Sequence, residues 1–299
     1  MSKFKSYFYQ TSDGEKLHFK CNFDIHKPIN KTVLVFNYGL VCSEQHWLYQ
    51  INYLKKEYPV LIHDYRGHFE SSGKENLEKI SIEQFSQDLG SLIQFYKINK
   101  VVMLGHSMGV NVCLEFAVNY PDLVEKLVLI SGSSLSAKEV MLGTNIMDIA
   151  VPYLEKLQDK FPGLLKTFWS SSASNPIVRY IIKQGGFNPS KVSDEFIRLY
   201  LTNVGILGPS LFLRLFKNMS EHQITMHYPQ IKCPVFIVSG NKDKVIPHFT
   251  QNYFLKSMPK AKLFTIKDGS HVPQVDFPAL VNKKIKSFLN GNSEVKSEV

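Results

Sequence analysis

The apolar residues of this chain occur in short runs that alternate with longer segments of helical spacing. The runs are rich in β-branched and aromatic residues, as is typical of strands buried on both faces, and lie at 32–36, 60–62, 101–104, 127–130, 235–238 and 262–266. Helical spacing follows at 81–96, from Met108 toward Pro121, and at 277–289. This alternation predicts an α/β fold with a mostly parallel, twisted sheet flanked by helices.

Two segments depart from the alternation. Near the start, apolar residues at 7–9 and 16–19 flank turn residues at 12–14, which predicts a β-hairpin. Residues 133–230 show helical spacing only, and prolines are expected to divide this segment into short helices, namely Pro152, Pro162, Pro176, Pro189 and Pro209. We therefore expect an α/β core of residues 1–132 and 231–299, with a helical cap of residues 133–230 inserted between the strands near Leu129 and Phe236.

The distribution of charge and the lengths of the apolar runs limit the partners and the cellular location that we expect. The chain has 299 residues and a formal net charge of +9, but its Lys and Arg residues are scattered, so no nucleic-acid partner is expected. The diffuse positive charge is compatible with peripheral contact with an anionic membrane surface. The start of the chain lacks the apolar run of a secretory signal, and no apolar stretch is long enough to span a bilayer, so we expect a cytoplasmic protein.

The cysteines indicate neither a metal centre nor a disulfide framework. Cys21, Cys42, Cys113 and Cys233 lie far apart, and none belongs to a short-spaced pair. We therefore expect no metal and no organic cofactor, and the chemistry is expected to come from side chains.

A nucleophile is predicted at Ser107, in the segment Gly-His-Ser-Met-Gly at 105–109. A serine hydroxyl becomes nucleophilic only where a base can reach it, and a sharp turn between a buried strand and a helix exposes it in that way. The strand predicted at 101–104 and the helix expected from Met108 supply this context. Glycines at 105 and 109 leave the room that such a turn needs.

A general base and its orienting carboxylate are predicted at the ends of two later strands. The strand at 235–238 leads to Asp243, and the strand at 262–266 leads to His271. The order serine, aspartate, histidine is the one that this architecture uses, and the carboxyl ends of parallel strands meet at one edge of the sheet. Asp268 is the rival acid, ranked below Asp243, whereas a turn role suffices for Asp122.

Two backbone amides are predicted to bind the oxyanion of the reaction. One is the N–H group of Met108, directly after the nucleophile, and the other is that of Leu40, in the loop after the strand at 32–36.

These motifs together resemble the α/β-hydrolase superfamily, and in particular its lid-bearing esterases, lipases and monoacylglycerol-lipase-like members. The segment 63–71 resembles the family's Asp-x-Arg-Gly-x-Gly-x-Ser loop, and 240–243 and 269–271 resemble its acid and base loops. Two positions depart from the pattern: Tyr38 replaces the histidine of the His-Gly oxyanion motif, and Phe69 replaces the second glycine of the arginine loop. A serine nucleophile separates the chain from the dehalogenases and epoxide hydrolases of the superfamily, which use an aspartate.

The expected function is hydrolysis of a carboxylic ester through an acyl-serine intermediate. The apolar cap favours a substrate with a hydrophobic acyl chain. Two alternatives stay open from the sequence. The same three residues also serve carbon-carbon bond hydrolases and cofactor-free peroxidase-type enzymes of this superfamily, and a catalytically silent binding protein could keep the fold.

Overall fold

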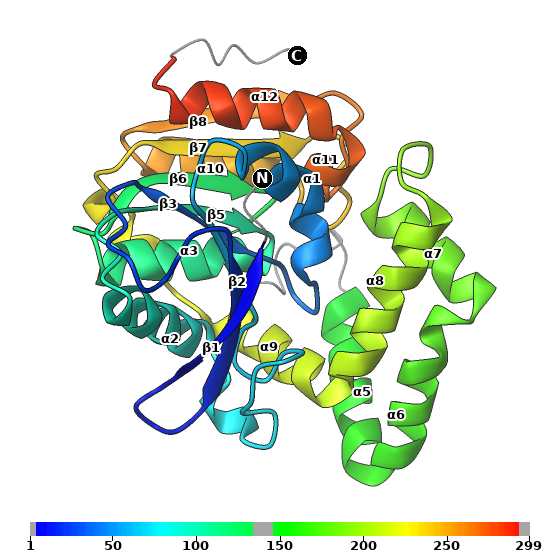
Figure 1. The fold of residues 1–299 in the computed structure, drawn as a ribbon. Helices are drawn as coiled ribbons and strands as arrows, with labels where there is room; N and C mark the ends of the chain where they lie inside the picture. Colours follow the sequence, from blue (N-terminus) through cyan, green and yellow to red (C-terminus); the bar gives the residue numbers. More distant parts are fainter. Residues whose placement is uncertain (1–3, 134–145, 293–299) are drawn as a thin grey trace.

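The computed structural model describes residues 4–133 and 146–292. Its centre is an eight-stranded sheet in the order β1-β2-β4-β3-β5-β6-β7-β8 (Figure 1). The strands are β1 (Lys5–Gln10), β2 (Lys16–Cys21), β3 (Val33–Asn37), β4 (Val60–His63), β5 (Val101–His106), β6 (Val124–Ile130), β7 (Val235–Gly240) and β8 (Ala261–Ile266). The predicted α/β class and the predicted hairpin are confirmed.

The sheet is parallel except at one edge. The β1–β2 hairpin is antiparallel, and β2 joins β4 in antiparallel register, whereas all pairs from β4 to β8 are parallel. The register places Asn37 opposite Gly105 and Gly240 opposite Ile266. The carboxyl ends of β3, β5, β7 and β8 therefore lie along one edge of the sheet, where the predicted site residues follow.

Helices cover both faces of the sheet because its central strands are apolar on both sides. In β3, Leu34 and Phe36 pack into one hydrophobic cluster and Val33 and Val35 into another. The first cluster includes residues of α1 (Leu48–Leu54) and α12 (Pro278–Leu289), and the second those of α2 (Ile82–Phe95), α3 (Met108–Asn119) and α10 (Phe249–Ser257). Shorter helical segments are η1 (Glu44–Trp47), η2 (Leu77–Lys79) and α11 (Pro273–Asp276).

The described residues between β6 and β7 are mainly helical. They form α5 (Ile146–Lys160), α6 (Pro162–Ser170), η4 (Ser171–Ala173), α7 (Pro176–Gly186), α8 (Asp194–Leu207), α9 (Pro209–Glu221) and η5 (Thr225–Gln230). Helices α5 to α8 lie on one side of the core in Figure 1, and α9 lies closer to α2. We call residues 146–230 the insertion; residues 134–145 of the expected cap lie outside the described residues. Asn203 on α8 donates a hydrogen bond to Ser43 of the core (3.1 Å), so the insertion contacts the sheet edge.

Three prolines of the insertion stand at the start of a helix. Pro162, Pro176 and Pro209 occupy the first helical turn, where the missing N–H group costs nothing. Pro152 was expected to divide two helices, and this is wrong, because it lies within α5. A proline inside a helix removes one backbone hydrogen bond, and here the neighbouring turns continue the helix across it.

Length and apolar character together distinguish helices that could cross a membrane. Among the described residues no single helix meets both requirements, and α8 with α9 meets them only as a pair bent by 91°.

Candidate active site

The backbone at Ser107 makes the sharp turn that the sequence predicts. Ser107 joins β5 to α3 with φ 52° and ψ −121°, in the left-handed region that non-glycine residues rarely adopt. A Cβ atom at Gly105 would lie 2.5 Å from the Gly109 carbonyl oxygen, and one at Gly109 would lie 2.3 Å from the Asn37 carbonyl oxygen. Side chains at either glycine would therefore push the helix away from the sheet, and the turn needs both positions bare.

Ser107, His271 and Asp243 form one hydrogen-bonded series. The Ser107 Oγ atom lies 3.1 Å from His271 Nε2, and His271 Nδ1 lies 3.0 Å from Asp243 Oδ2. The other carboxylate oxygen, Oδ1, accepts from the backbone N–H groups of Val245 (2.9 Å) and Ile246 (2.8 Å). These bonds fix the buried carboxylate so that Nδ1 of the imidazole donates to it, which leaves Nε2 to accept the serine proton.

Hydrogen bonds also join the two loops that carry the acid and the base. The Lys242 N–H group donates to the Gly269 carbonyl (2.9 Å), and the Asp268 N–H group donates to the Asn241 side chain (2.7 Å). The loops after β7 and β8 therefore hold each other in place. Asp268, the rival acid, is exposed and has no hydrogen bond to His271, so the structure brings Asp243 and not Asp268 to the base.

The two predicted oxyanion donors have free N–H groups. Met108 is the first residue of α3, where no intrahelical acceptor is available. Leu40 lies in the loop after β3 and lines the same cavity as Ser107. Within residues 4–133 and 146–292 neither amide donates to a protein acceptor. Both could donate to an oxygen atom of a bound molecule.

Three polar side chains near this series escaped the sequence analysis. His106 donates from Nε2 to the carbonyl oxygen of His271 (3.0 Å), and its ring stacks on His46 with centroids 5.9 Å apart. Burial lowers the pKa of His46 to about 4 and that of His106 well below its usual value, so both rings stay neutral. Asp276 accepts a hydrogen bond from the Ser270 N–H group (2.7 Å), and burial raises the pKa of its carboxyl.

A partial signal exists in the sequence for two of these three residues. His106 stands inside the serine motif, and Asp276 interrupts an apolar segment just after His271. His46 gives none, because only the folded chain brings it beside His106.

The two departures from the family pattern have a structural explanation. Tyr38 is buried, and its hydroxyl donates to Asp64 (3.3 Å), while the Tyr65 hydroxyl donates to the Tyr38 carbonyl (3.0 Å). Phe69 adopts φ 42°, so the left-handed backbone of the loop is present without the glycine. Arg66 in the same loop is buried and pairs with carboxylates of the β1–β2 turn and of α2. The arginine loop thus braces the segment that leads to Leu40.

A second series of the same residue types occurs at the edge of the sheet. Ser6 Oγ lies 2.6 Å from His18 Nε2, and His18 Nδ1 lies 2.7 Å from Asp64 Oδ2. Ser6 stands in the regular antiparallel pairing of β1 with β2, and it does not line the cavity around Ser107. Ser6 therefore lacks the strand-to-helix turn that carries Ser107.

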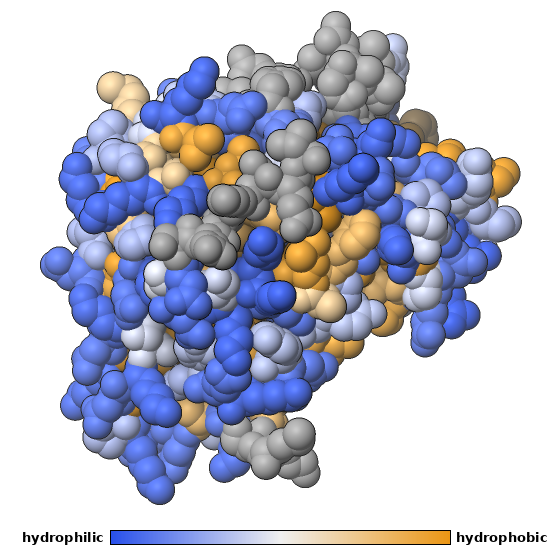
Figure 2. Space-filling model, turned by 90° about the horizontal axis from the view of Figure 1, so that it is seen from above, coloured by the Kyte–Doolittle hydropathy of each residue, from blue (hydrophilic) through white to orange (hydrophobic). Residues whose placement is uncertain are grey.

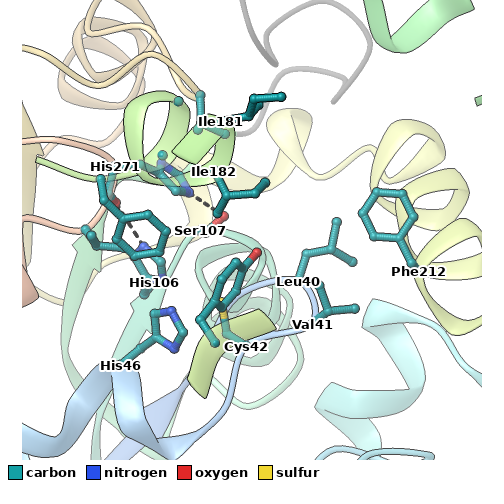
Figure 3. A pocket seen from close by; sticks show the side chains of 16 residues that line it. Leu40, Val41, Cys42, His46, His106, Ser107, Ile181, Ile182, Phe212 and His271 are labelled. Atoms are coloured by element: carbon teal, nitrogen blue, oxygen red, sulfur yellow. Dashed lines mark hydrogen bonds between the residues drawn. The ribbon is translucent and has the colours of Figure 1, made fainter. Parts of the chain in front are cut away.

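A cavity of about 290 Å³ opens at Ser107. The core contributes Leu40, Val41 and His271, and the insertion contributes Ile182 and Phe212 (Figure 3). Its lining is mainly apolar. Among the described residues no group of three or more His, Cys, Asp or Glu side chains is arranged to hold a metal ion.

Comparison with known proteins identifies the family of the chain. A family model described as "alpha/beta hydrolase fold" matches residues 32–278. The chain belongs to the alpha/beta hydrolase fold family. The match spans the serine turn and both loops described above.

The relatives of this alpha/beta hydrolase differ in the share of their own length that the match covers. It is 25% identical over 260 residues to the mouse protein named ABHD8, with 86% of the chain but only 55% of ABHD8 covered. The chain thus spans about half the length of that relative. An esterase from Exiguobacterium antarcticum has TM-score 0.74 at 21% identity, covering 96% of the chain and 100% of the esterase. The enol-lactonase from Burkholderia xenovorans has TM-score 0.76 at 18% identity, covering 95% and 100%.

Proposed function

We propose that this alpha/beta hydrolase cleaves carboxylic esters with a hydrophobic acyl chain, with Ser107 as the nucleophile. The observation that carries the proposal is the hydrogen-bonded series from Ser107 through His271 to Asp243, which opens into an apolar cavity. The fold neighbours named an esterase and an enol-lactonase lend support, because a lactone is a cyclic ester.

Acylation follows from the positions of these atoms. Ser107 Oγ attacks the ester carbonyl carbon while His271 Nε2 accepts its proton, and a bond forms between Oγ and the acyl carbon. The amides of Leu40 and Met108 donate to the oxyanion, and Asp243 stabilises the imidazolium. The intermediate collapses when the carbon-oxygen bond to the alcohol breaks, and the alcohol leaves with the proton from His271.

Deacylation repeats these steps with water as the nucleophile. His271 accepts a proton from water, the resulting hydroxide attacks the acyl carbon, and the bond to Oγ breaks. The acid departs and Ser107 regains its proton. The apolar cavity walls suit an acyl chain, since burial of each CH₂ group contributes about 0.8 kcal/mol to binding.

A first experiment tests the nucleophile with p-nitrophenyl esters of increasing chain length. Ser107→Ala should lower kcat by a factor on the order of 10⁶, because the acyl-enzyme can no longer form. Ser6→Ala is the matched control, since Ser6 also hydrogen-bonds a histidine that contacts an aspartate. It should retain wild-type activity.

An organophosphonate probe provides a second readout. Mass spectrometry should find the probe on Ser107 and not on Ser6. Labelling at another residue, full activity of Ser107→Ala, or turnover confined to carbon-carbon substrates would contradict the proposal.

A further inference from the structure

Helices α6 and α7 each pack inward through one pair of apolar residues four positions apart. On α6, Leu165 is buried, and the Trp169 indole N–H group donates to the Val204 carbonyl (3.0 Å). On α7, Val178 and Ile182 pack against the small hydrophobic cluster of the insertion. Because residues four apart share one helix face, these pairs account for the inner side of both helices.

Beside each inner pair lies a second apolar set that faces outward. We call it the outer stripe, and its members are between 60% and 67% exposed: Leu164, Phe168, Ile177, Tyr180 and Ile181. Within the described part of the chain, α7 has no buried residue at all. Large exposed apolar patches often mark binding surfaces, whereas apolar side chains exposed singly need no explanation, so the charge and the place of this set decide what it can bind.

The charge along residues 160–186 has one sign. Between residues 160 and 186 the chain carries Lys160, Lys166, Arg179 and Lys183 and no Asp or Glu. Lys183 pairs with Asp194 at the start of α8 (2.6 Å), and Arg179 lies close enough to attract the same carboxylate. The four cations of the segment outnumber this one acid, so a net positive charge is available to an external partner. The stripe therefore combines apolar side chains with positive charge.

The outer stripe also reaches the mouth of the cavity that contains Ser107. Ile181 is 60% exposed and at the same time lines that cavity, beside Ile182 (Figure 3). Seen from above, hydrophobic residues gather at the surface between the core and the insertion, with hydrophilic residues around them (Figure 2). A molecule bound along the stripe would thus lie next to the cavity entrance.

We propose that the outer stripe docks this protein on a membrane surface that contains anionic lipids. The apolar side chains enter the interface, and the cations contact the headgroups. A second copy of the chain suits the surface less well, because a two-fold contact would bring the cationic segments of both copies together. Docking is independent of the chemistry at Ser107, but its consequence, delivery of a lipid ester to the cavity, rests on the proposed function.

Vesicle sedimentation tests the docking separately from catalysis when the Ser107→Ala protein is used. We expect it to sediment with vesicles of phosphatidylcholine and phosphatidylglycerol, and more weakly with phosphatidylcholine alone. Adding Leu164→Ser and Phe168→Ser, or Ile177→Ser and Tyr180→Ser, should lower the partition coefficient at least about tenfold. Met226→Ser is the matched control, since Met226 is 89% exposed on η5, away from the stripe.

The charge contribution has its own pair of variants. Lys166→Glu with Arg179→Glu should reduce binding to the anionic vesicles only, whereas Lys256→Glu on α10 should leave it unchanged. Equal sedimentation of the stripe variants and the control would overturn the proposal. So would a dimer in sedimentation velocity that the stripe substitutions dissociate, because the stripe would then bind a second copy. Either result leaves hydrolysis of soluble esters by the wild type unaffected.

Discussion

His106 connects the strand before the proposed nucleophile, Ser107, to the loop that carries the proposed base, His271. Its Nε2 atom donates to the carbonyl oxygen of His271, while its Nδ1 atom is buried with no hydrogen-bond partner among the described residues. A buried, unsatisfied nitrogen destabilises a protein by about 1–3 kcal/mol, so an apolar residue would be the more stable choice here. We infer that His106 is a positioning residue, which holds His271 in line with Ser107.

This role predicts a loss in kcat when the donor is removed. His106→Phe keeps a ring but cannot donate, and we expect kcat to fall about tenfold, as for the loss of one hydrogen bond of about 1.4 kcal/mol, with little change in KM. His106→Gln retains an N–H donor and should recover part of the activity. Steady-state kinetics with a short p-nitrophenyl ester measures both. If His106 had only a structural role, the variants would differ from the wild type in melting temperature and not in kcat per folded molecule.

Helix α2 ends in a backbone conformation that its sequence does not favour. Lys97 has φ 52°, and the N–H groups of Lys97 and Ile98 donate to the carbonyls of Gln94 and Ile93 (both 3.0 Å). This double hydrogen bond is the Schellman arrangement, in which glycine is the preferred residue at the left-handed position. The Lys97 side chain is exposed, so its replacement removes no packing.

Lys97→Gly should therefore stabilise the protein by about 1 kcal/mol, because the steric cost of a Cβ atom in the left-handed region disappears. Lys97→Ala is the control, since it removes the charge but keeps the Cβ atom, and it should give no gain. Urea denaturation of the two variants and the wild type measures the difference. Equal stability of the glycine and alanine variants would show that the backbone strain is absent.

At the level of elements, the sequence predicted the helices and strands whose apolar residues recur with a regular spacing. The helix expected at 81–96 is α2, and the Ser81 side chain caps it by accepting from the Gln84 N–H group. Helix α10 was not predicted, because its nine residues show little amphipathic pattern, and of its described apolar side chains only Phe254 is deeply buried. Short helices owe their stability to packing on the sheet, which a local pattern does not record.

At the level of the molecule, the sequence predicts a feature of the site where a local motif marks it. It does not predict a feature that arises only when distant segments pack together. The turn at Ser107 and the strand ends before Asp243 and His271 have local signatures, so the sequence places them at one sheet edge. The contacts of His46 and Asp276 depend on how loops from distant segments pack, and the spacing of residues in the sequence does not predict them. The cavity shape likewise depends on how the insertion lies over the core.

The interior of the whole molecule contains several histidines that stay neutral in the folded state. Burial lowers the pKa values of His46, His63 and His68 to about 4, against an ordinary value of 6.5. In the unfolded chain these rings bind protons as the pH falls below 6.5, whereas in the folded protein they do so only near pH 4. Their stabilising contribution is therefore complete above pH 6.5 and is lost as the pH falls toward 4.

Acid should consequently unfold this protein earlier than it unfolds proteins stabilised mainly by paired carboxylates. Between pH 6.5 and 4 the free energy of unfolding should fall with a slope of up to about 1.4 kcal/mol per pH unit for each buried histidine. His68→Gln removes one of the three groups, so the slope should become shallower by about that amount, while His26→Gln, at an exposed site, should leave it unchanged. Urea denaturation at a series of pH values measures the slopes. If stability stayed constant down to pH 4, these histidines would have to be charged, or hydrated, inside the folded protein.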